Sequence, residues 1–123
     1  MSFNDLMSDY VARINNAIMV DKNEVEVLKN KLVTNVSKKL VRLGYLSDFK
    51  EDERTLTLTL NLEKIEKLQR VSTPGHRKYY SFNEFPKILG GIGFLILTTS
   101  QGIKTQVEAH QEKIGGEVLF SIY

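Results

Sequence analysis

The sequence predicts an α+β protein of two small lobes. We expect an N-terminal α-β-α-β-β lobe over residues 1–65 and a mostly antiparallel β lobe with short helices over residues 66–123. Three observations support this fold class. The first half holds two amphipathic helical stripes, Thr55–Leu60 alternates strictly between polar and apolar residues, and the second half alternates short apolar runs with Gly and Pro turn signals.

The first lobe opens as helix, strand, helix. A helix is predicted over residues 4–18, where Ser2 and Asp5 resemble a capping box, and a short strand over residues 23–27. A second helical stripe covers residues 32–43 and ends at Gly44. The first helix has apolar residues every four positions, namely Leu6, Tyr10, Ile14 and Ile18.

A hairpin and a charged connector complete this lobe. Residues 45–50 and 55–60 are predicted to form two strands joined by an acidic turn, and the second strand should bury one of its faces. Residues 63–68 form a charged connector, where we place the boundary between the lobes.

The second lobe begins with another predicted hairpin. Residues 69–73 are extended, residues 73–76 carry proline and glycine where a type II turn needs them, and residues 77–82 return as a strand. A short helix is predicted from Asn83 to Leu89.

The remainder of this lobe is strand, helix, strand. The glycines Gly90, Gly91 and Gly93 end the short helix and admit a strand over residues 94–99. A second capping box, Thr105 with Glu108, starts a helix that Gly115-Gly116 stops, and residues 117–123 close the chain as a strand.

Composition limits the function classes. The chain has 123 residues, 41% hydrophobic content, no cysteine and a net charge of +2, which suits one small globular protein without disulfides. Its two histidines cannot by themselves form a zinc site, so we expect no metal and no cofactor. Because Asp5 stands near the start and no apolar run reaches about 20 residues, we expect neither a presequence nor a membrane span.

Charge is uneven along the chain. The first 62 residues carry nine basic and nine acidic groups, whereas residues 67–104 carry six basic groups against the single acid Glu84. A local basic patch of this kind favours a polyanionic partner.

Catalysis is disfavoured. A nucleophile hypothesis would pair Ser100 with His76 or His110, but no nucleophile-elbow glycines surround Ser100. The glycines of residues 90–93 precede a strand, whereas phosphate loops follow a strand and open a helix. We therefore expect no enzymatic activity.

The segment Thr98-Thr99-Ser100-Gln101-Gly102 suits RNA better. An A-form helix displays 2′-hydroxyls in a shallow minor groove, so its reader needs short neutral donors and acceptors flanked by cations. Gly102 lets backbone approach closely, and the helix that begins near Thr105 would direct N–H groups toward phosphate. The alternative is that the hydroxyl cluster is simply the end of a strand.

Other candidates keep two readings each. One of Tyr79 and Tyr80 faces the core, and the other either stacks on a base or also packs on the core. Arg13 either reaches a phosphate or is solvated, and Glu117 either accepts from base amino groups or anchors a backbone amide. The full set of candidate RNA-binding residues is Arg13, Arg70, Ser72, Arg77, Lys78, Tyr79, Thr98, Thr99, Ser100, Gln101, Gly102, Lys104 and Glu117.

Four blocks of the chain resemble one family. These blocks, Arg70-Val71-Ser72-Thr73-Pro74-Gly75-His76-Arg77, residues 86–93, Leu97-Thr98-Thr99-Ser100-Gln101-Gly102-Ile103 and residues 114–119, are similar to the bacterial-type small-subunit ribosomal proteins of the S-eight family. Residues 8–17 and 43–49 match more weakly.

The resemblance implies a two-lobe α+β protein that binds a helical region in the central domain of small-subunit ribosomal RNA during early assembly, mainly through its C-terminal lobe. It also implies contacts with neighbouring small-subunit proteins and, in bacteria, repression of its own operon's messenger RNA. By the family's pattern, Thr98, Thr99, Ser100 and Glu117 are principal RNA contacts, with residues 77–79 beside them.

Several positions depart from the family's pattern. The family commonly has a basic residue at Gln101, an apolar one at Lys104 and a second arginine at Asn15, and residues 60–68 form a shorter segment than usual. Fewer phosphate contacts would give a shallower salt dependence.

The sequence therefore predicts a structural, RNA-binding ribosomal protein located in the small subunit, in bacterial cytoplasm or in an organelle matrix or stroma. The alternative is a protein-interaction module within a larger assembly, for which RNA contact is incidental.

Overall fold

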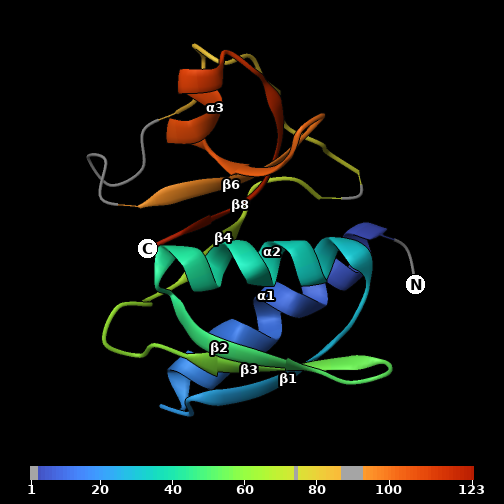
Figure 1. The fold of residues 1–123 in the computed structure, drawn as a ribbon, viewed down its shortest axis with the longest axis vertical. Helices are drawn as coiled ribbons and strands as arrows, with labels where there is room; N and C mark the ends of the chain where they lie inside the picture. The colour runs from blue at the N-terminus through green and yellow to red at the C-terminus, as the bar shows by residue number, and fades with distance from the viewer. Residues whose placement is uncertain (1–2, 74, 87–92) are drawn as a thin grey trace. The chain divides into compact units, whose positions relative to one another are not determined.

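A computed structural model describes residues 3–73, 75–86 and 93–123 (Figure 1). The chain separates into two compact units, Met1–Leu68 and Gln69–Tyr123, called here the first and second units. The predicted α+β fold class is confirmed, because both units combine helices with antiparallel strands.

The first unit is a two-layer α/β structure. Its elements are α1 (Phe3–Met19), β1 (Glu24–Leu28), α2 (Lys31–Leu43), β2 (Leu46–Glu51) and β3 (Thr55–Leu60). The strands form an antiparallel sheet in the order β1-β3-β2, and both helices lie on one face of it (Figure 1). The predicted hairpin of β2 and β3 is confirmed.

The core of this unit lies between the helices and the sheet. Leu56, Leu58 and Leu60 of β3 are buried, since the alternation in the sequence turns every second side chain toward the helices. Tyr10 of α1 and Ser37 of α2 are also fully buried, and their hydroxyls form a hydrogen bond of 2.9 Å. Burial raises the pKa of Tyr10 well above its ordinary value, because the ionised phenol would be charged in an apolar environment.

Helix α2 has a defined cap at each end. The side chain of Asn30 accepts a hydrogen bond of 2.8 Å from the N–H of Val33. Gly44 ends the helix with φ of 89°, in the left-handed region that favours glycine. The predicted stop at Gly44 is therefore confirmed. A capping box of Ser2 and Asp5 was also predicted at the start of α1, but Ser2 lies outside the described residues.

The connector is fixed to α1 by one side chain. The amide of Asn15 donates to the carbonyl of Leu68 over 2.7 Å and accepts from its N–H over 2.9 Å. This two-way pairing holds the last residue of the first unit against the helix that opens it.

The second unit is built on a five-stranded sheet with one helix. The elements are β4 (Leu68–Arg70), which begins at the last residue of the first unit, β5 (Tyr79–Tyr80), β6 (Phe94–Thr99), β7 (Gly102–Thr105), α3 (Gln106–Glu112) and β8 (Gly116–Ile122). The strand order is β4-β8-β6-β7, and β5 also pairs with β8. Its core consists of Leu95, Leu97, Ala109 and Val118, against which Val71, Tyr80, Phe85 and Ile114 pack.

Two predictions for residues 69–89 were wrong within the described residues. Residues 77–82 do not return as a strand along residues 69–73, because β5 pairs instead with β8 and the two arms share only a bridge between Thr73 and His76. Residues 83–86 contain a turn and no helix. The rest of that predicted helix, with Gly90 and Gly91, lies outside the described residues, as does Pro74 of the predicted turn.

Helix α3 confirms one predicted signal and corrects another. Thr105 and Glu108 form the capping box, with both reciprocal hydrogen bonds present. The helix ends at Lys113 in the left-handed conformation, before Gly115-Gly116. These glycines instead admit close backbone approach, because an added Cβ would lie 2.5 Å from the carbonyl oxygen of Tyr80 or of Thr98, respectively. The strand β7 was not predicted.

Candidate nucleic-acid interface

The β6–β7 hairpin carries most of the hydroxyl-rich segment. Ser100 and Gln101 form its tip, and Gly102 has φ of 104°, which suits a hairpin whose turn is followed by a left-handed residue. Ser100, Gln101 and Gly102 are exposed, while Thr98 and Thr99 are half-buried. The tip therefore presents one hydroxyl, one amide and an open stretch of backbone.

Thr99 shapes this turn through its own hydroxyl. Its Oγ1 donates to the carbonyl oxygen of Gly102 over 2.8 Å and accepts from the N–H of Gln101 over 3.1 Å. The hydroxyl of Thr99 has a single proton, which it donates to Gly102 within the turn. Thr99 therefore holds the turn in the conformation that exposes Ser100.

Three strands bring a row of candidate side chains onto one face of the sheet. Thr98 of β6 and Tyr79 of β5 both lie opposite Glu117 of β8, one on each side. Opposite residues of antiparallel strands share a face, so the three side chains are neighbours. Tyr79 is 63% exposed whereas Tyr80 packs on the core, which matches the expectation that one tyrosine faces outward.

Glu117 is the most unusual member of this row. It is only 4% exposed, and its Oε2 has no hydrogen-bond partner among the described residues. Its charge acts on two arginines. Burial lowers the pKa of Arg70 and the charge of Glu117 partly offsets this, while the pKa of Arg77 is raised by a hydrogen bond with the Tyr79 side chain and by Glu117.

Ser72 organises the loop that carries Arg77 and Lys78. It is fully buried, its carbonyl oxygen accepts from Nη2 of Arg70, and its Oγ accepts from the N–H of Lys78 over 2.9 Å. The carbonyl of Lys78 in turn accepts from the N–H of Val118 over 2.9 Å, which ties the loop to β8.

Other candidates lie apart from this row. Lys104 faces the α3 side of the sheet, where it forms an ion pair of 3.2 Å with Glu112. Arg13 belongs to the first unit, where it pairs with Asp9 at 2.9 Å and donates to the carbonyl of Glu26. At the start of α3, the N–H groups of Thr105 and Glu108 donate to side chains of the capping box.

The second unit thus brings together candidate residues from separate segments. Thr98 and Glu117 lie beside Tyr79, and the loop held by the buried Ser72 adds Arg70 and Arg77. The close approach of Gly116 to Thr98 was not predicted. It has no local sequence signal, because it depends on the pairing of β6 with β8.

No group of three or more metal-ligating side chains occurs in the described part of the chain. His110 directs its Nδ1 at the carbonyl oxygen of Phe82, 2.9 Å away. Within residues 3–73, 75–86 and 93–123, no helix is long and apolar enough to cross a membrane.

Comparison with known proteins defines the class as ribosomal. The family described as "Ribosomal protein S8" matches residues 5–123, and the chain belongs to this family. It is the S-eight family that the four blocks resemble, so that prediction is confirmed. The family is not enzymatic, and the chain is a structural ribosomal protein of the small subunit.

The relatives cover the chain almost end to end. "Small ribosomal subunit protein uS8" of Parabacteroides distasonis is 41% identical and covers 97% of this chain and 98% of its own length. The protein of the same name from Ruthia magnifica is 37% identical over 100% of both chains. "Small ribosomal subunit protein uS8c" of Lotus japonicus is 40% identical, covering 97% of this chain and 98% of its own.

Proposed function

We propose that the second unit binds a helical region in the central domain of small-subunit ribosomal RNA and supports assembly of that domain. The single observation that carries this proposal is the tip of the β6–β7 hairpin, which exposes Ser100, Gln101 and Gly102 on a rigid turn. Neutral donors and acceptors on such an edge match the 2′-hydroxyls of an A-form minor groove.

Each residue of the tip has a distinct role in this proposal. Ser100 and Gln101 exchange hydrogen bonds with ribose hydroxyls and base edges. Gly102 has open space where a Cβ would stand, so RNA can approach its backbone. Thr99 acts indirectly, by holding the turn.

The row of Thr98, Glu117 and Tyr79 extends the contact across the sheet. The buried Oε2 of Glu117 has no donor among the described residues, and an amino group of a base is a donor of the right kind. Tyr79 offers an exposed ring for stacking, which is worth about 1–3 kcal/mol per base.

Positioning charge comes from the loop before β5. Arg77 is exposed and Lys78 is half-buried, and both follow the bend that Ser72 fixes. Arg70 acts mainly by holding this bend through its bond to Ser72. Lys104 and Arg13 share their charge with acids, so we expect smaller contributions from them.

Two further partners follow from the same chemistry. Neighbouring small-subunit proteins would contact surfaces that RNA leaves uncovered. The chain's own messenger RNA would bind if it presents a similar helix, in which case the two RNAs compete for one surface.

A pair of matched serine variants tests the RNA surface. Ser100→Ala should weaken binding to a central-domain fragment of small-subunit ribosomal RNA by about 1–3 kcal/mol if the hydroxyl is desolvated in the complex. Ser47→Ala removes the same group from an exposed position of β2 in the first unit and should leave affinity unchanged. Filter binding or calorimetry measures both.

Equal affinities for wild-type and Ser100→Ala proteins would refute the role of Ser100. A titration with salt tests the broader alternative of a protein-interaction module. RNA binding through phosphates weakens log-linearly with salt, whereas binding that barely responds to salt would favour the alternative.

A further inference from the structure

Strand β1 is an open edge of the sheet in the first unit. The strand order is β1-β3-β2, so within the described residues β1 pairs with a strand on one side only. The N–H of Leu60 donates to the carbonyl of Asn23 over 2.7 Å, and the N–H of Lys29 donates to the carbonyl of Arg54 over 3.0 Å. Bonded and non-bonded pairs alternate along an antiparallel ladder, so the odd-numbered residues of β1 direct their backbone groups at β3.

The even-numbered residues of β1 direct their backbone groups toward the open side. These residues are Glu24, Glu26 and Leu28. The recorded contact to these groups comes from Nη1 of Arg13, which donates to the carbonyl oxygen of Glu26 over 3.1 Å. A carbonyl oxygen accepts two hydrogen bonds, so this contact leaves room for another donor. The edge is therefore a row of donors and acceptors with which an added strand can pair.

A hollow lies on each face of the sheet along this edge. On the helix side, the end of α1 and β1 line a hollow of about 360 Å³, whose apolar part is Ala17, Val20 and Val25. On the other face, a hollow of about 250 Å³ includes Thr57, whose two neighbours in β3 are buried beneath the helices. Side chains of a strand alternate between faces, so an added strand would direct successive side chains into the two hollows.

The rim of the first hollow is apolar and uncovered. Val20 is 69% exposed and Met19 beside it is 80% exposed, more than any other large hydrophobic residue of the described chain. A single exposed apolar side chain is ordinary on a protein surface, but these two are adjacent and lie beside an unpaired strand. Contact with another polypeptide would remove them from water.

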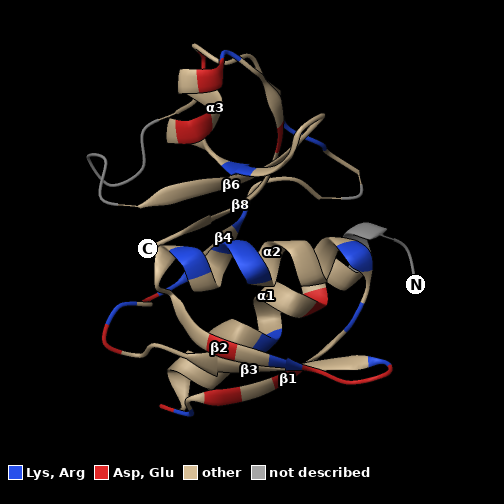
Figure 2. Ribbon diagram, viewed as in Figure 1, with Lys and Arg blue, Asp and Glu red and all other residues tan. Residues whose placement is uncertain are grey.

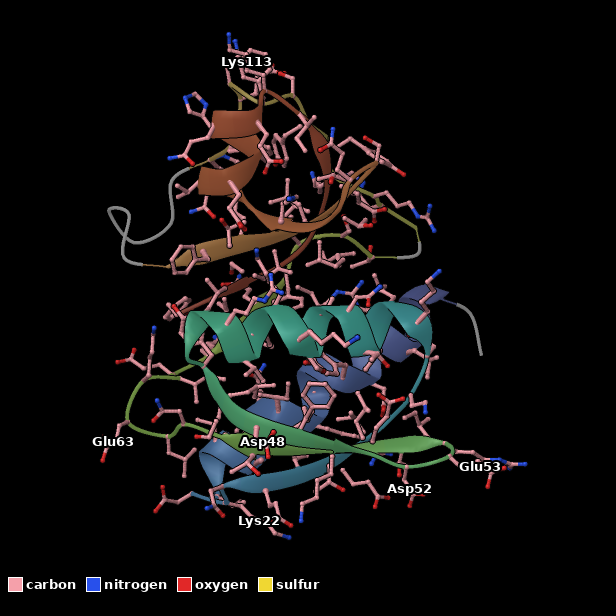
Figure 3. The ribbon with its side chains drawn as sticks, in the orientation of Figure 1. Lys22, Asp48, Asp52, Glu53, Glu63 and Lys113 are labelled. Atoms are coloured by element: carbon pink, nitrogen blue, oxygen red, sulfur yellow. The ribbon has the colours of Figure 1, made fainter. Side chains whose placement is uncertain are left out.

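Charge along the edge indicates the kind of partner. Glu24 and Glu26 are exposed on the face away from the helices, and no recorded ion pair of the described residues includes them. Figure 2 shows acidic residues along β1. Asp48, labelled in Figure 3, adds an acid across the sheet, while Lys22 and Lys50 are the nearby bases. Acids two residues apart match lysine or arginine at alternate positions of an added strand, because opposite residues share a face.

Two other occupants fit this edge less well. RNA would bring phosphates against the exposed carboxylates of Glu24 and Glu26, which repel them. A second copy of the chain that paired antiparallel along all of β1 would place Glu26 opposite its own counterpart, and like charges directly opposite are destabilising. A basic protein segment has neither fault.

We propose that the open edge of β1 binds an extended segment of a neighbouring small-subunit protein, which adds to the sheet as a fourth strand. A basic, an apolar and a basic side chain follow one another in this segment. The basic ones lie beside Glu24 and Glu26, and the apolar one enters the hollow at Val20 and Val25. This inference rests on the proposed function only where that function expects neighbouring small-subunit proteins as partners, and it does not depend on the RNA surface of the second unit.

Hydrogen exchange tests strand addition directly. The probe is a short synthetic peptide that alternates lysine and valine, added until about nine tenths of the protein is bound. Exchange measured by NMR should slow about tenfold at the amides of Glu24 and Glu26, which gain partners in the complex. Exchange at Val25 and Val27 should change little, because their amides already pair with β3. Unchanged exchange at Glu24 and Glu26, or equal slowing at all four amides, would overturn strand addition.

Neutralised acids test the charge of the edge. Glu24→Gln/Glu26→Gln should bind the peptide about 2- to 30-fold more weakly at low salt, since each exposed ion pair contributes modestly. The control Glu63→Gln/Glu66→Gln removes two exposed acids of the same unit outside the sheet and should bind as the wild type does. Equal affinities of the two double variants would contradict a basic partner, and circular dichroism checks that both are folded.

A cross-linking experiment tests the edge in assembled small subunits. Because the chain has no cysteine, Glu24→Cys provides one thiol for a photo-activated cross-linker, and Glu63→Cys is the control. Position 24 should cross-link to a protein segment with basic residues at alternate positions, which mass spectrometry identifies, and position 63 should not reach that segment. Cross-links from position 24 to RNA alone, or to no protein, would overturn the inference.

The same variants separate this inference from the proposed function. Glu24→Gln/Glu26→Gln should bind the central-domain RNA fragment with wild-type affinity, whereas Ser100→Ala should bind it more weakly. If position 24 finds no protein while Ser100→Ala still weakens RNA binding, the inference is overturned and the proposed function stands. If position 24 finds its basic segment while Ser100→Ala binds RNA normally, the edge is supported and the role of Ser100 is refuted.

Discussion

Gly116 is a position where one methyl group should disturb both the fold and the RNA surface. It begins β8 beside the end of β6. A Cβ built on it would lie 2.5 Å from the carbonyl oxygen of Thr98 and 2.8 Å from Cγ2 of Thr99. Ordinary contacts begin at 3.4 Å, so the strands would have to separate by several tenths of an ångström.

The expected size of the effect combines two terms. Inserting a methyl against backbone costs about 1–3 kcal/mol, because a strand that is hydrogen-bonded on both sides cannot move aside easily. Replacing glycine also lowers the conformational entropy of the unfolded chain, which stabilises the folded state by about 0.4–1 kcal/mol. Gly116→Ala should therefore lower the free energy of unfolding by about 1–2 kcal/mol.

Gly75→Ala is the matched control. It makes the same chemical change where no atom lies within 4 Å of the new Cβ and where the backbone is not left-handed. Urea unfolding followed by circular dichroism should give a lower midpoint for Gly116→Ala and an unchanged or slightly higher one for Gly75→Ala. Because Thr98 moves with the strand, RNA affinity should fall only in Gly116→Ala. Equal midpoints for the two variants would refute the close-approach argument.

Two further predictions concern caps and ionisation. Thr105→Ala removes the capping box of α3 and should cost about 1 kcal/mol of stability in urea unfolding, whereas Thr105→Ser keeps the hydroxyl and should cost less, and equal losses would contradict the capping role. Because burial raises the pKa of Tyr10, only the unfolded state releases this proton just above pH 10, so the stability that depends on the neutral phenol is complete below about pH 10 and is lost as pH rises further. Tyr10→Phe should lower the free energy of unfolding by about 1–3 kcal/mol at neutral pH, because it removes the hydrogen-bond partner of Ser37. Between about pH 10 and 11, the stability of this variant should fall less steeply than that of the wild type. Parallel curves of stability against pH for the two proteins would contradict the burial of a neutral phenol.

The elements that the sequence predicted well depend on local chemistry. The alternation of residues 55–60 fixes which side chains of β3 are buried, and Gly44 ends α2 because only glycine readily adopts its φ. The Thr105 and Glu108 capping box is likewise local, because its two partners are three residues apart. Such signals act within a few residues and can be read without knowing the fold.

The elements that the sequence missed depend on distant partners. β5 pairs with β8 across nearly 40 residues, and nothing in residues 77–82 indicates that partner. The segment Gly102–Thr105 is too short to show a strand period by itself, but β6 provides its edge. The close approach of Gly116 to Thr98 has the same origin.

The candidate surface also combines features that local sequence predicts with features that depend on the fold. Residues 98–102 are consecutive, so their presence at one turn was predictable. That Thr99 uses its hydroxyl inside the turn, and that Ser72 is buried, required the hydrogen bonds of the structure. The position of Glu117 between Thr98 and Tyr79 required the register of three strands.

Equal numbers of basic and acidic residues in a segment do not mean that their charges are evenly distributed over the folded surface. The first 62 residues have equal numbers of basic and acidic groups, so the sequence places the excess of positive charge in the second part of the chain. The helix period gathers Lys31, Lys38 and Arg42 on one face, while the acids follow β1 and the β2–β3 turn. Over distances comparable with the screening length of about 8–10 Å, an anion near α2 would experience these three cations more strongly than the neutral sum of the unit.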